Sequence, residues 1–397
     1  MRFPHLSGCV LLAAATLSVS AAPELPAVTA AMQATVAAHE VAGAVTEVVT
    51  KDKVLHLGTT GLADIAGSRP MTTDALFWIA SMTKPITSTA ILMLQDEGKL
   101  NVNDPVAKYL PEFAALKTPS GQPANLTIRQ LLTHTSGLAD LRAAATAKAK
   151  TLRELVAIFL TEPMQFEPGS TWRYTSSGFD VAGLIVEVVS GQPFEDFLQQ
   201  HLFDPLGMTD TTFYPSEAQR QRLAHAYRAN PATGEYSLLT GLGPNGPIPT
   251  KGEAVPHGGG GLFSTAGDYA RFCQMLLGGG TFNGRRYLSP AAYQAMTTIS
   301  TGDLPTGYTK TKLSRVLSWG LGVAIVHAPA ADGVSAELAP GSFGHPGAWG
   351  TAAWIDPVRG VAYVMMVQRP NMPDNFENPP ALAFIRAAAA ALPQRAR

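Results

Sequence analysis

Hydrophobic and β-branched residues gather in short runs near both ends of the chain, and turn-forming residues separate these runs. Lys51-Asp52-Lys53 divides the first pair of runs, and Asp356-Pro357-Val358-Arg359-Gly360 divides the last pair. Both places predict a β-hairpin, because Pro, Gly, Asp and Lys interrupt residues that favour strands. The predicted strands are Val41–Thr50, Val54–Leu62, Trp319–His327, Thr351–Ile355 and Val361–Val367.

The middle of the chain places its hydrophobic residues at helical spacing instead. Ile86, Ala90, Met93 and Leu94 share one helical face, and Gly98 ends that helix. Thr127 is a capping residue at the start of a second helix. Further helices are predicted at Thr151–Leu160, Val181–Val189 and Phe194–Leu202, with an alanine-rich helix at Phe384–Leu392 near the C-terminus.

Strands at both ends with helices between them lack the alternation of a parallel doubly wound sheet. Strands that are distant in sequence can still pair in an antiparallel sheet. We therefore predict an α/β (α+β) fold, in which an antiparallel sheet flanked by helices is built from both chain ends and carries an inserted all-helical domain. The α/β domain is expected at residues 22–80 and 262–397, and the helical domain with its connecting loops at residues 81–261.

The N-terminal segment has the features of a secretory signal peptide. Arg2 gives a weakly positive start, Cys9–Val19 is a short apolar run, and Val19-Ser20-Ala21 supplies small residues for cleavage after Ala21. Residues 1–21 are therefore predicted to be removed, and the mature protein to be secreted or periplasmic. A buried N-terminal helix is the alternative. Cleavage would leave Cys273 as the lone cysteine, so no disulfide within the chain is expected.

The composition limits the possible partners. The chain has 397 residues, 46% of them hydrophobic, and a formal net charge of −1, which gives no long-range attraction to nucleic acid or anionic lipid. No later run approaches the roughly 18 apolar residues of a membrane span. The nine His residues are scattered, without a pair such as His-x-x-x-His, so no metal and no other cofactor is expected.

Ser81-Met82-Thr83-Lys84 stands where the first long helix begins. Residues three apart share a helical face, so the Lys84 amine can reach the Ser81 hydroxyl. A serine hydroxyl is a weak nucleophile until a base removes its proton, and a neutral lysine can be that base. Since lysine titrates near about 10.4 in water, burial has to lower its pKa. The same pattern also arises by chance, as a helix cap followed by a solvated lysine.

Two further motifs accompany this one. Trp172-Arg173-Tyr174-Thr175-Ser176 and Gly344-His345-Pro346-Gly347 resemble the Tyr-x-Asn-like loop and the Lys-Thr-Gly-like strand of the serine β-lactamase and penicillin-binding protein superfamily. The resemblance covers about residues 28–390, is class C β-lactamase-like, and is closest in motif to the family VIII-type serine esterases. Framework segments that match in order are Leu94–Leu110, Leu131–Leu138, Pro205–Met208 and Gly261–Asp268.

The resemblance implies catalytic roles for the matching residues. Ser81 is the nucleophile, and Lys84 and Tyr174 share the proton transfers, as base in acylation and then as acid toward the leaving group. The backbone N–H groups of Ser81 and Ala348 form the oxyanion hole. Water or another alcohol would then release the acyl group.

Three more residues are expected to bind the substrate. His345 orients or hydrogen-bonds its acyl portion, Ser176 stands where Asn is usual, and Gly347 lets the substrate lie along the strand edge. Near pH 7 a neutral His345, in place of a cationic Lys, cannot form an ion pair with a substrate carboxylate. Ser176 shortens the contact that holds a lactam side chain.

Both departures favour a neutral substrate, a small-molecule ester or amide. The leading hypothesis is an exported serine hydrolase with an acyl-enzyme on Ser81, acting as a carboxylesterase on small esters. Alternatives are β-lactamase or DD-peptidase activity of the penicillin-binding type, acyl transfer, and a non-catalytic binding module of the same fold. No Gly-x-Ser-x-Gly motif occurs, which excludes the α/β-hydrolase nucleophile elbow.

Other chemically interesting residues have structural interpretations. His134, within Thr133-His134-Thr135-Ser136-Gly137, is expected to organise a loop. Asp180 is expected to cap or orient a helix. The glycine run Gly258–Gly261 lacks the lysine of a phosphate-binding loop and is interpreted as a turn that leads into Leu262.

Overall fold

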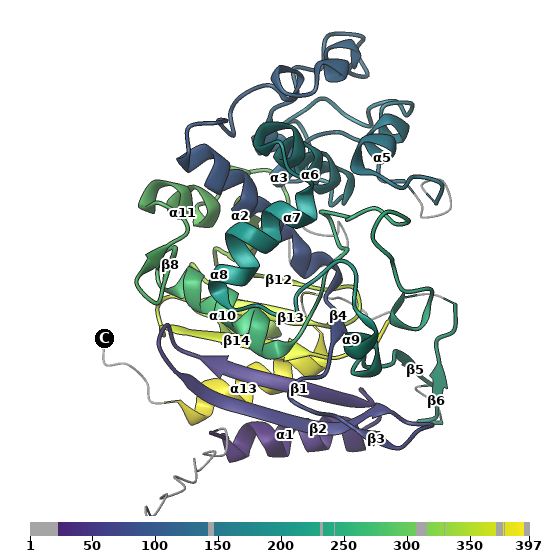
Figure 1. Ribbon diagram of the computed structural model, residues 1–397. Helices are drawn as coiled ribbons and strands as arrows, with labels where there is room; N and C mark the ends of the chain where they lie inside the picture. Colours follow the sequence, from purple (N-terminus) through teal and green to yellow (C-terminus); the bar gives the residue numbers. More distant parts are fainter. Residues whose placement is uncertain are drawn as a thin grey trace, which may run out of the picture.

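The computed structural model describes residues 23–141, 147–230, 233–241, 243–306, 316–328, 330–370, 376 and 378–392 (Figure 1). The predicted signal peptide at residues 1–21 lies outside the described residues. Helices and strands are named by the labels of Figure 1.

A single antiparallel sheet combines strands from both ends of the chain. The order of its strands is β10-β11-β12-β13-β14-β1-β2-β3. β1 lies between β2 and β14, with Val45 opposite Met366, so the N-terminal and C-terminal parts of the fold meet in the sheet. The bounds are β1 Gly43–Val49, β2 Val54–Asp64, β3 Arg69–Pro70, β10 Leu317–Trp319, β11 Ala324–Val326, β12 Phe343–Pro346, β13 Ala352–Asp356 and β14 Val361–Met366.

Helices cover both faces of this sheet. α1 (Pro26–Ala37) and α13 (Pro379–Ala391) lie on the lower face in Figure 1, and α10 (Ala266–Leu277) lies on the upper face. Val45 belongs to the hydrophobic cluster on the side of α10, whereas Val48 belongs to the cluster that includes α1 and α13. Every residue of β1 is therefore buried, including the polar Thr46 and Glu47 at its centre.

The predicted fold class is confirmed, as are both hairpins. The prediction of one strand at Trp319–His327 was wrong: β10 and β11 are two antiparallel strands, with Trp319 opposite Ala324. Gly322 in the turn between them has a φ of 77°, a conformation open to glycine. The apolar pattern continues through this turn because Leu321 is buried in the core, which hid the turn in the sequence.

The inserted segment is mainly helical and forms the upper part of the molecule in Figure 1. α2 (Thr83–Asp96) runs through it and follows a short 3₁₀ turn, η1 (Ala80–Met82). α6 (Ser177–Ser190) packs beside α2 and begins earlier than the apolar pattern predicts. The other helices are η2 Val106–Lys108, η3 Pro111–Ala115, α3 Ile128–Leu132, α5 Leu152–Phe159, α7 Phe194–Leu198, η4 Gln199–Phe203, α8 Asp204–Leu206, α9 Glu217–Gln221 and η5 Gly243–Asn245.

Short elements complete the described part of the chain. They are the strand pairs β4 Phe77–Trp78 with β7 Phe263–Ser264, β5 Tyr227–Ala229 with β6 Tyr236–Leu238, and β8 Thr281–Phe282 with β9 Arg285–Arg286, and the helices α11 Pro290–Thr297 and α12 Val334–Glu337. β5 and β6 lie within residues 81–261, so that segment also carries a small strand pair. The domain boundaries themselves stay a prediction.

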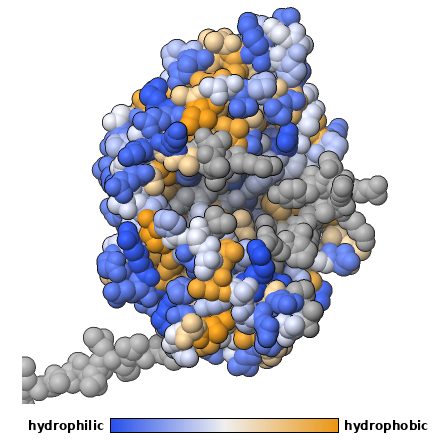
Figure 2. Space-filling model, turned by 90° about the vertical axis from the view of Figure 1, so that its right-hand side faces the viewer, coloured by the Kyte–Doolittle hydropathy of each residue, from blue (hydrophilic) through white to orange (hydrophobic). Residues whose placement is uncertain are grey.

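Among the described residues on the face shown in Figure 2, hydrophobic side chains form separate patches between hydrophilic ones. The large hydrophobic side chains that are exposed, such as Val54, Val188 and Val358, come from distant elements. None of the described helices combines the length and the hydrophobicity that a membrane span needs.

Candidate active site

Ser81 lies in a tight turn between the small sheet of β4 and β7 and the start of α2. Ala80 has a φ of 45°, which is uncommon for a residue other than glycine. Thr83 holds this turn: its Oγ1 donates to the Ala80 carbonyl over 2.7 Å and accepts from the Leu262 N–H over 3.1 Å. Such backbone strain persists where the surroundings over-determine it, which is common at functional sites.

The Lys84 amine lies among three oxygens inside the protein. Its Nζ is 3.1 Å from Ser81 Oγ, 3.3 Å from Ser176 Oγ and 2.6 Å from the Gly259 carbonyl oxygen. Lys84 has no exposed surface. Burial lowers the pKa of Lys84 to about 7, against the opposing effect of the Asp140 and Asp180 carboxylates. A large fraction of this amine is therefore neutral near neutral pH.

Ser176 faces Lys84 because another residue caps its helix. Ser176 occupies the N-cap position of α6, but its own side chain makes no capping hydrogen bond. Oδ1 of Asp140 instead accepts from the backbone N–H groups of Ser176 and Ser177, over 3.0 and 3.2 Å. A carboxylate at a helix N-terminus is favourable, and here it leaves the Ser176 hydroxyl for Lys84.

The glycine run contributes a group that the sequence reasoning missed. Residues 258–261 pass between α2 and α6, where Thr87 Oγ1 donates to the Gly258 carbonyl over 2.7 Å. A Cβ on Gly259 would stand 2.7 Å from Cβ of Ser176, so only glycine fits against α6 there. This packing presents the Gly259 carbonyl to Lys84.

Tyr174 and His345 meet beside this cluster. The hydroxyl of Tyr174 lies 3.4 Å from Nε2 of His345, and Lys84 Nζ lies 4.8 Å from the centroid of the Tyr174 ring. Nδ1 of His345 is 2.6 Å from the Pro346 carbonyl, which can only accept, so Nδ1 carries the proton and Nε2 accepts from Tyr174. Burial, reinforced by Lys84, lowers the pKa of His345 to about 3, so this imidazole is neutral.

Gly347 lies where the end of β12 touches the segment before Ser81. A Cβ at Gly347 would stand 2.5 Å from the Ile79 carbonyl and would overlap Thr351 Oγ1. The Gly347 N–H donates to the Thr351 carbonyl over 2.7 Å. Glycine is thus needed for this close approach of two backbones, and Ala348, which follows it, is exposed.

His134 is fully buried between the ring of Tyr174 and that of Trp319 in β10. Its ring stacks on that of Tyr174 with 4.4 Å between centroids, and its Nδ1 accepts from the Thr175 N–H over 3.1 Å. Burial lowers the pKa of His134 well below its usual value, and the charge of Lys84 adds to this effect. A neutral, fully buried imidazole in this position orders the Tyr174 loop.

Asp180 holds the glycine run to α6. Its Oδ1 accepts from the Gly259 N–H over 3.1 Å, and its Oδ2 lies 3.4 Å from Nδ1 of His257. The sequence interpretation of Asp180 as a helix cap overlooked this distant partner. A signal was present, because Asp180 follows Ser176 by one helical turn and therefore lies on the same face.

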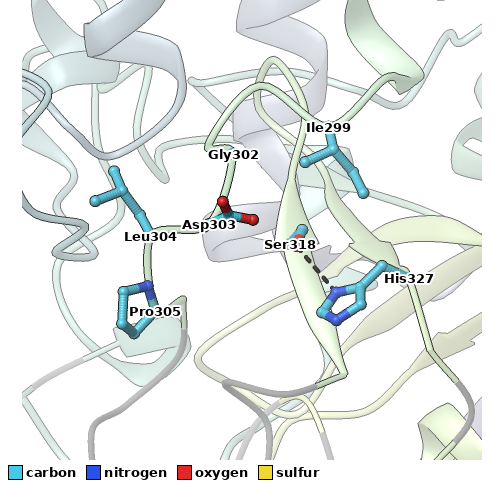
Figure 3. A pocket seen from close by; sticks show the side chains of 7 residues that line it. All are labelled: Ile299, Gly302, Asp303, Leu304, Pro305, Ser318 and His327. Atoms are coloured by element: carbon cyan, nitrogen blue, oxygen red, sulfur yellow. Dashed lines mark hydrogen bonds between the residues drawn. The ribbon is translucent and has the colours of Figure 1, made fainter.

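A cavity in the described part of the chain lies apart from this cluster. It has a volume of about 640 Å³ and is lined by Ile299, Gly302, Asp303, Leu304, Pro305, Ser318 and His327, with Ser318 Oγ 2.9 Å from His327 Nδ1 (Figure 3). Ser318 and Trp319 are neighbours in β10, so their side chains point to opposite faces. Trp319 packs against Tyr174 and His345, and the cavity therefore lies across β10 from them.

Metal chemistry has no evident site in the part of the chain that the structure describes. There, no group of three or more His, Cys, Asp or Glu side chains is arranged to hold a metal ion. The chemistry available to the cluster is that of its hydroxyl, amine, phenol and imidazole groups.

Comparisons with known proteins find a family profile and several relatives that match this chain. The sequence profile of the family described as Beta-lactamase matches residues 28–387. Protein Rv1367c of Mycobacterium tuberculosis is 35% identical over 82% of this chain and 85% of its own length. Esterase EstB of Burkholderia gladioli is 33% identical over 59% of this chain and 65% of its own. Other relatives are named as penicillin-binding proteins.

The fold is also found among solved structures. EstCE1, described as a hydrolase with promiscuous acyltransferase activity, superimposes with a TM-score of 0.76 at 22% identity, over 92% of this chain and 98% of its own. At this identity the likeness concerns the fold.

Proposed function

Because the chain belongs to the beta-lactamase family of serine hydrolases, we propose that it is an exported serine esterase that carries its acyl intermediate on Ser81. One observation carries the proposal: the amine of fully buried Lys84 lies 3.1 Å from Ser81 Oγ. A neutral amine at this distance can take the hydroxyl proton as the oxygen attacks a carbonyl carbon.

The proposed reaction has two halves. Ser81 Oγ attacks the ester carbonyl, its proton passes to Lys84, and the backbone N–H groups of Ser81 and Ala348 stabilise the oxyanion. The bond to the alcohol then breaks, and the alcohol oxygen receives a proton through Lys84 and Tyr174. Water next attacks the acyl-enzyme and gives up a proton to the same pair. The bond between the acyl carbon and Ser81 Oγ breaks, the serine oxygen takes that proton back, and the acid is released.

The third motif supports a neutral substrate. His345 has a pKa of about 3 and stays uncharged where a cation would be needed to bind a substrate carboxylate. An ester without a carboxylate loses nothing at this position, whereas a penicillin or a peptide C-terminus loses an ionic contact. The likeness to esterase EstB points in the same direction.

Lactam hydrolysis or DD-peptidase activity is the second candidate, because the matching family is described as Beta-lactamase and other relatives are named as penicillin-binding proteins. Under the esterase proposal, penicillin acylates Ser81 far more slowly than a small ester does. A stable penicillin adduct would favour a penicillin-binding role, and rapid penicillin turnover would favour a lactamase.

Export is a separate part of the proposal, and it relies on the N-terminal sequence pattern. Expression of the full chain in a Gram-negative host should yield periplasmic protein whose mass corresponds to a chain that starts at Ala22. Retention of residues 1–21 on cytoplasmic protein would contradict export and leave the esterase proposal untouched.

The catalytic proposal is tested with p-nitrophenyl butyrate and a fluorophosphonate. Ser81→Ala should lower hydrolysis by at least about 1,000-fold and abolish the fluorophosphonate adduct. Ser88→Ala is the matched control, because Ser88 is buried in the same helix and its Oγ has no hydrogen-bond partner among the described residues. An unmodified wild-type protein would instead support a non-catalytic binding module.

A further inference from the structure

We infer that Asp180 is a positioning residue, which fixes the Gly259 carbonyl so that the Lys84 amine turns its lone pair toward the hydroxyl it must deprotonate. The inference rests on the proposed role of Lys84 as the base for Ser81. It extends that role to a residue on another helix, which acts through the backbone of a glycine.

The number of hydrogen-bond donors and acceptors around Lys84 decides where its lone pair can point. A neutral amine has two N–H donors and one lone pair, and here it has three oxygen neighbours. The Gly259 carbonyl can only accept, so one N–H must point toward it. The Ser176 hydroxyl can accept the second N–H. The lone pair then faces the Ser81 hydroxyl, which is the orientation that proton transfer needs.

Without the Gly259 carbonyl, this order is lost. Both remaining neighbours are hydroxyl groups, and each can donate or accept. Each can then accept one N–H of the amine, which leaves the lone pair facing neither hydroxyl. The carbonyl, which is the nearest of the three oxygens at 2.6 Å, occupies one N–H and so leaves one N–H and the lone pair for the two hydroxyls.

Asp180 is the side chain that fixes the peptide of Gly259. It is 3% exposed, and its Oδ1 accepts from the Gly259 N–H over 3.1 Å. Thr87 holds the preceding peptide through the Gly258 carbonyl. Glycine has the freest backbone of any residue, so a segment of four glycines needs such anchors to keep one carbonyl in place.

The first turn of α6 thus serves the amine twice. Ser176 contacts Lys84 directly over 3.3 Å, and Asp180, four residues later, reaches it through Gly259. Residues at this spacing lie above one another on a helix, so a single rigid element sets both contacts. This arrangement couples the position of the glycine run to that of the loop that carries Tyr174 and Ser176.

The charge of Asp180 has a second, separable effect. The groups that face this region are the Lys84 amine, the Asp140 carboxylate and the half-exposed His257 imidazole. Burial lowers the pKa of His257, but Asp180 outweighs this effect and the pKa is raised overall. Asp140 and Asp180 both raise the pKa of Lys84, so loss of the Asp180 charge should lower it further.

Three variants separate geometry from charge. Asp180→Ala removes the acceptor and the charge, Asp180→Asn keeps an oxygen for the Gly259 N–H but removes the charge, and Thr87→Val removes only the hydroxyl that holds Gly258. His257→Ala is the control, because it removes the other partner of Asp180 and leaves the Gly259 contact. Each is assayed for the pH profile of kcat/KM with p-nitrophenyl butyrate and for the rate of fluorophosphonate labelling of Ser81.

The expected results differ among the variants. A misplaced catalytic group costs on the order of 100-fold, so Asp180→Ala should lose about that factor in both rates. Asp180→Asn should recover most of this lost rate. In Asp180→Ala and in Asp180→Asn, the acidic limb of the pH profile of kcat/KM should move to lower pH, because both variants lack the carboxylate charge. Thr87→Val should lose an intermediate factor without moving that limb. His257→Ala should stay within roughly threefold of the wild type.

Other outcomes overturn the inference. A positioning role would be excluded if the fluorophosphonate labels Ser81 in the wild type and if Asp180→Ala has the same labelling rate and the same pH profile of kcat/KM as the wild type. Asp180→Ala could fail to fold, which thermal unfolding would reveal. In that case two results together would exclude the positioning role: wild-type rates in Thr87→Val, and an acidic limb of the pH profile that does not move in Asp180→Asn. Absence of labelling in the wild type would instead remove the proposed function, a distinct result.

Discussion

The imidazole of His134 stacks on the phenol ring of Tyr174, with 4.4 Å between the ring centroids and 29° between their planes. The same imidazole accepts the Thr175 N–H, so one residue fixes both the ring and the backbone of the loop. His134→Phe keeps a ring for the stack but leaves the buried Thr175 N–H without its acceptor. We expect the free energy of unfolding to fall by about 1–3 kcal/mol, measured by urea denaturation.

A matched control exists for this substitution. His201, in η4, also stacks on an aromatic ring, that of Phe197 in α7, and neither residue contacts Lys84, Tyr174 or His345 through a ring contact or hydrogen bond that the structure shows. His201→Phe should change stability by no more than about 0.5 kcal/mol. Equal losses in the two variants would show that the Thr175 hydrogen bond contributes nothing specific.

Lys84 should make the protein more stable as the pH rises from about 7 to about 10.5. Its pKa falls from 10.5 in the unfolded chain to about 7 in the folded protein, so the unfolded chain binds more protons in this window. Stability rises with pH under that condition, by about 1.4 kcal/mol for each pH unit. Lys84→Met should remove this slope, which denaturant unfolding at pH 7, 8 and 9 can measure. Parallel slopes in the two proteins would contradict a lowered pKa.

The pH profile of activity should follow the same group. The base must be neutral, so kcat/KM should rise with pH through about 7, where Lys84 loses its proton. A profile that is flat from pH 5 to 9 would show that another group accepts the Ser81 proton.

Lys84 and Tyr174 should behave as one unit. Lys84→Ala and Tyr174→Phe should each lower kcat/KM by about 100-fold or more, because they share the proton transfers. The double variant should lose far less than the product of the two factors, measured as a double-mutant cycle on p-nitrophenyl butyrate. Strict multiplication of the two losses would place the residues in independent roles.

His345→Lys should shift the preference toward anionic substrates. The new ammonium would give a penicillin carboxylate the partner that neutral His345 does not provide. We expect the rate of Ser81 acylation by labelled penicillin to rise by about tenfold or more, while ester hydrolysis falls. An unchanged penicillin rate would mean that position 345 does not face the substrate carboxylate.

Gly347→Ala should disturb the approach of β12 to the nucleophile turn. The added methyl group would stand 2.5 Å from the Ile79 carbonyl, so the strand end must shift, at a cost of about 1–3 kcal/mol in stability. The fall in kcat/KM should be larger than the loss of stability alone explains, because the proposed oxyanion donor, the Ala348 N–H, moves with the strand end. Gly260→Ala is the control, since its Cβ would find its nearest atom at 3.6 Å. Comparable activity losses in the two variants would contradict a specific role for this contact.

The sequence predicted correctly the features that depend on the spacing of residues close together in the chain. The contact of Ser81 with Lys84 follows from their separation by three residues on one helix, and the hairpins follow from turn residues between apolar runs. The fold class followed from the order of these elements along the chain.

What the sequence hid depends on contacts between distant segments. The Gly259 carbonyl is 175 residues from Lys84, and a glycine run has neither a periodic pattern nor a side chain to mark its role. The role of Asp140 was equally hidden, because it caps a helix whose N-cap residue, Ser176, lies 36 residues later. The turn between β10 and β11 escaped notice since its buried Leu321 continues the apolar pattern of the strands.

The pairing of β1 with β14 has a consequence for how the protein is made. β1 leaves the ribosome early, yet its neighbour is encoded near the end of the chain, so one side of Val45 and Val48 lacks a partner until synthesis is almost complete. Contacts of such long sequence separation slow folding, and an unpaired apolar strand is prone to aggregate. Nascent chains that stop before residue 361 should therefore depend on chaperones.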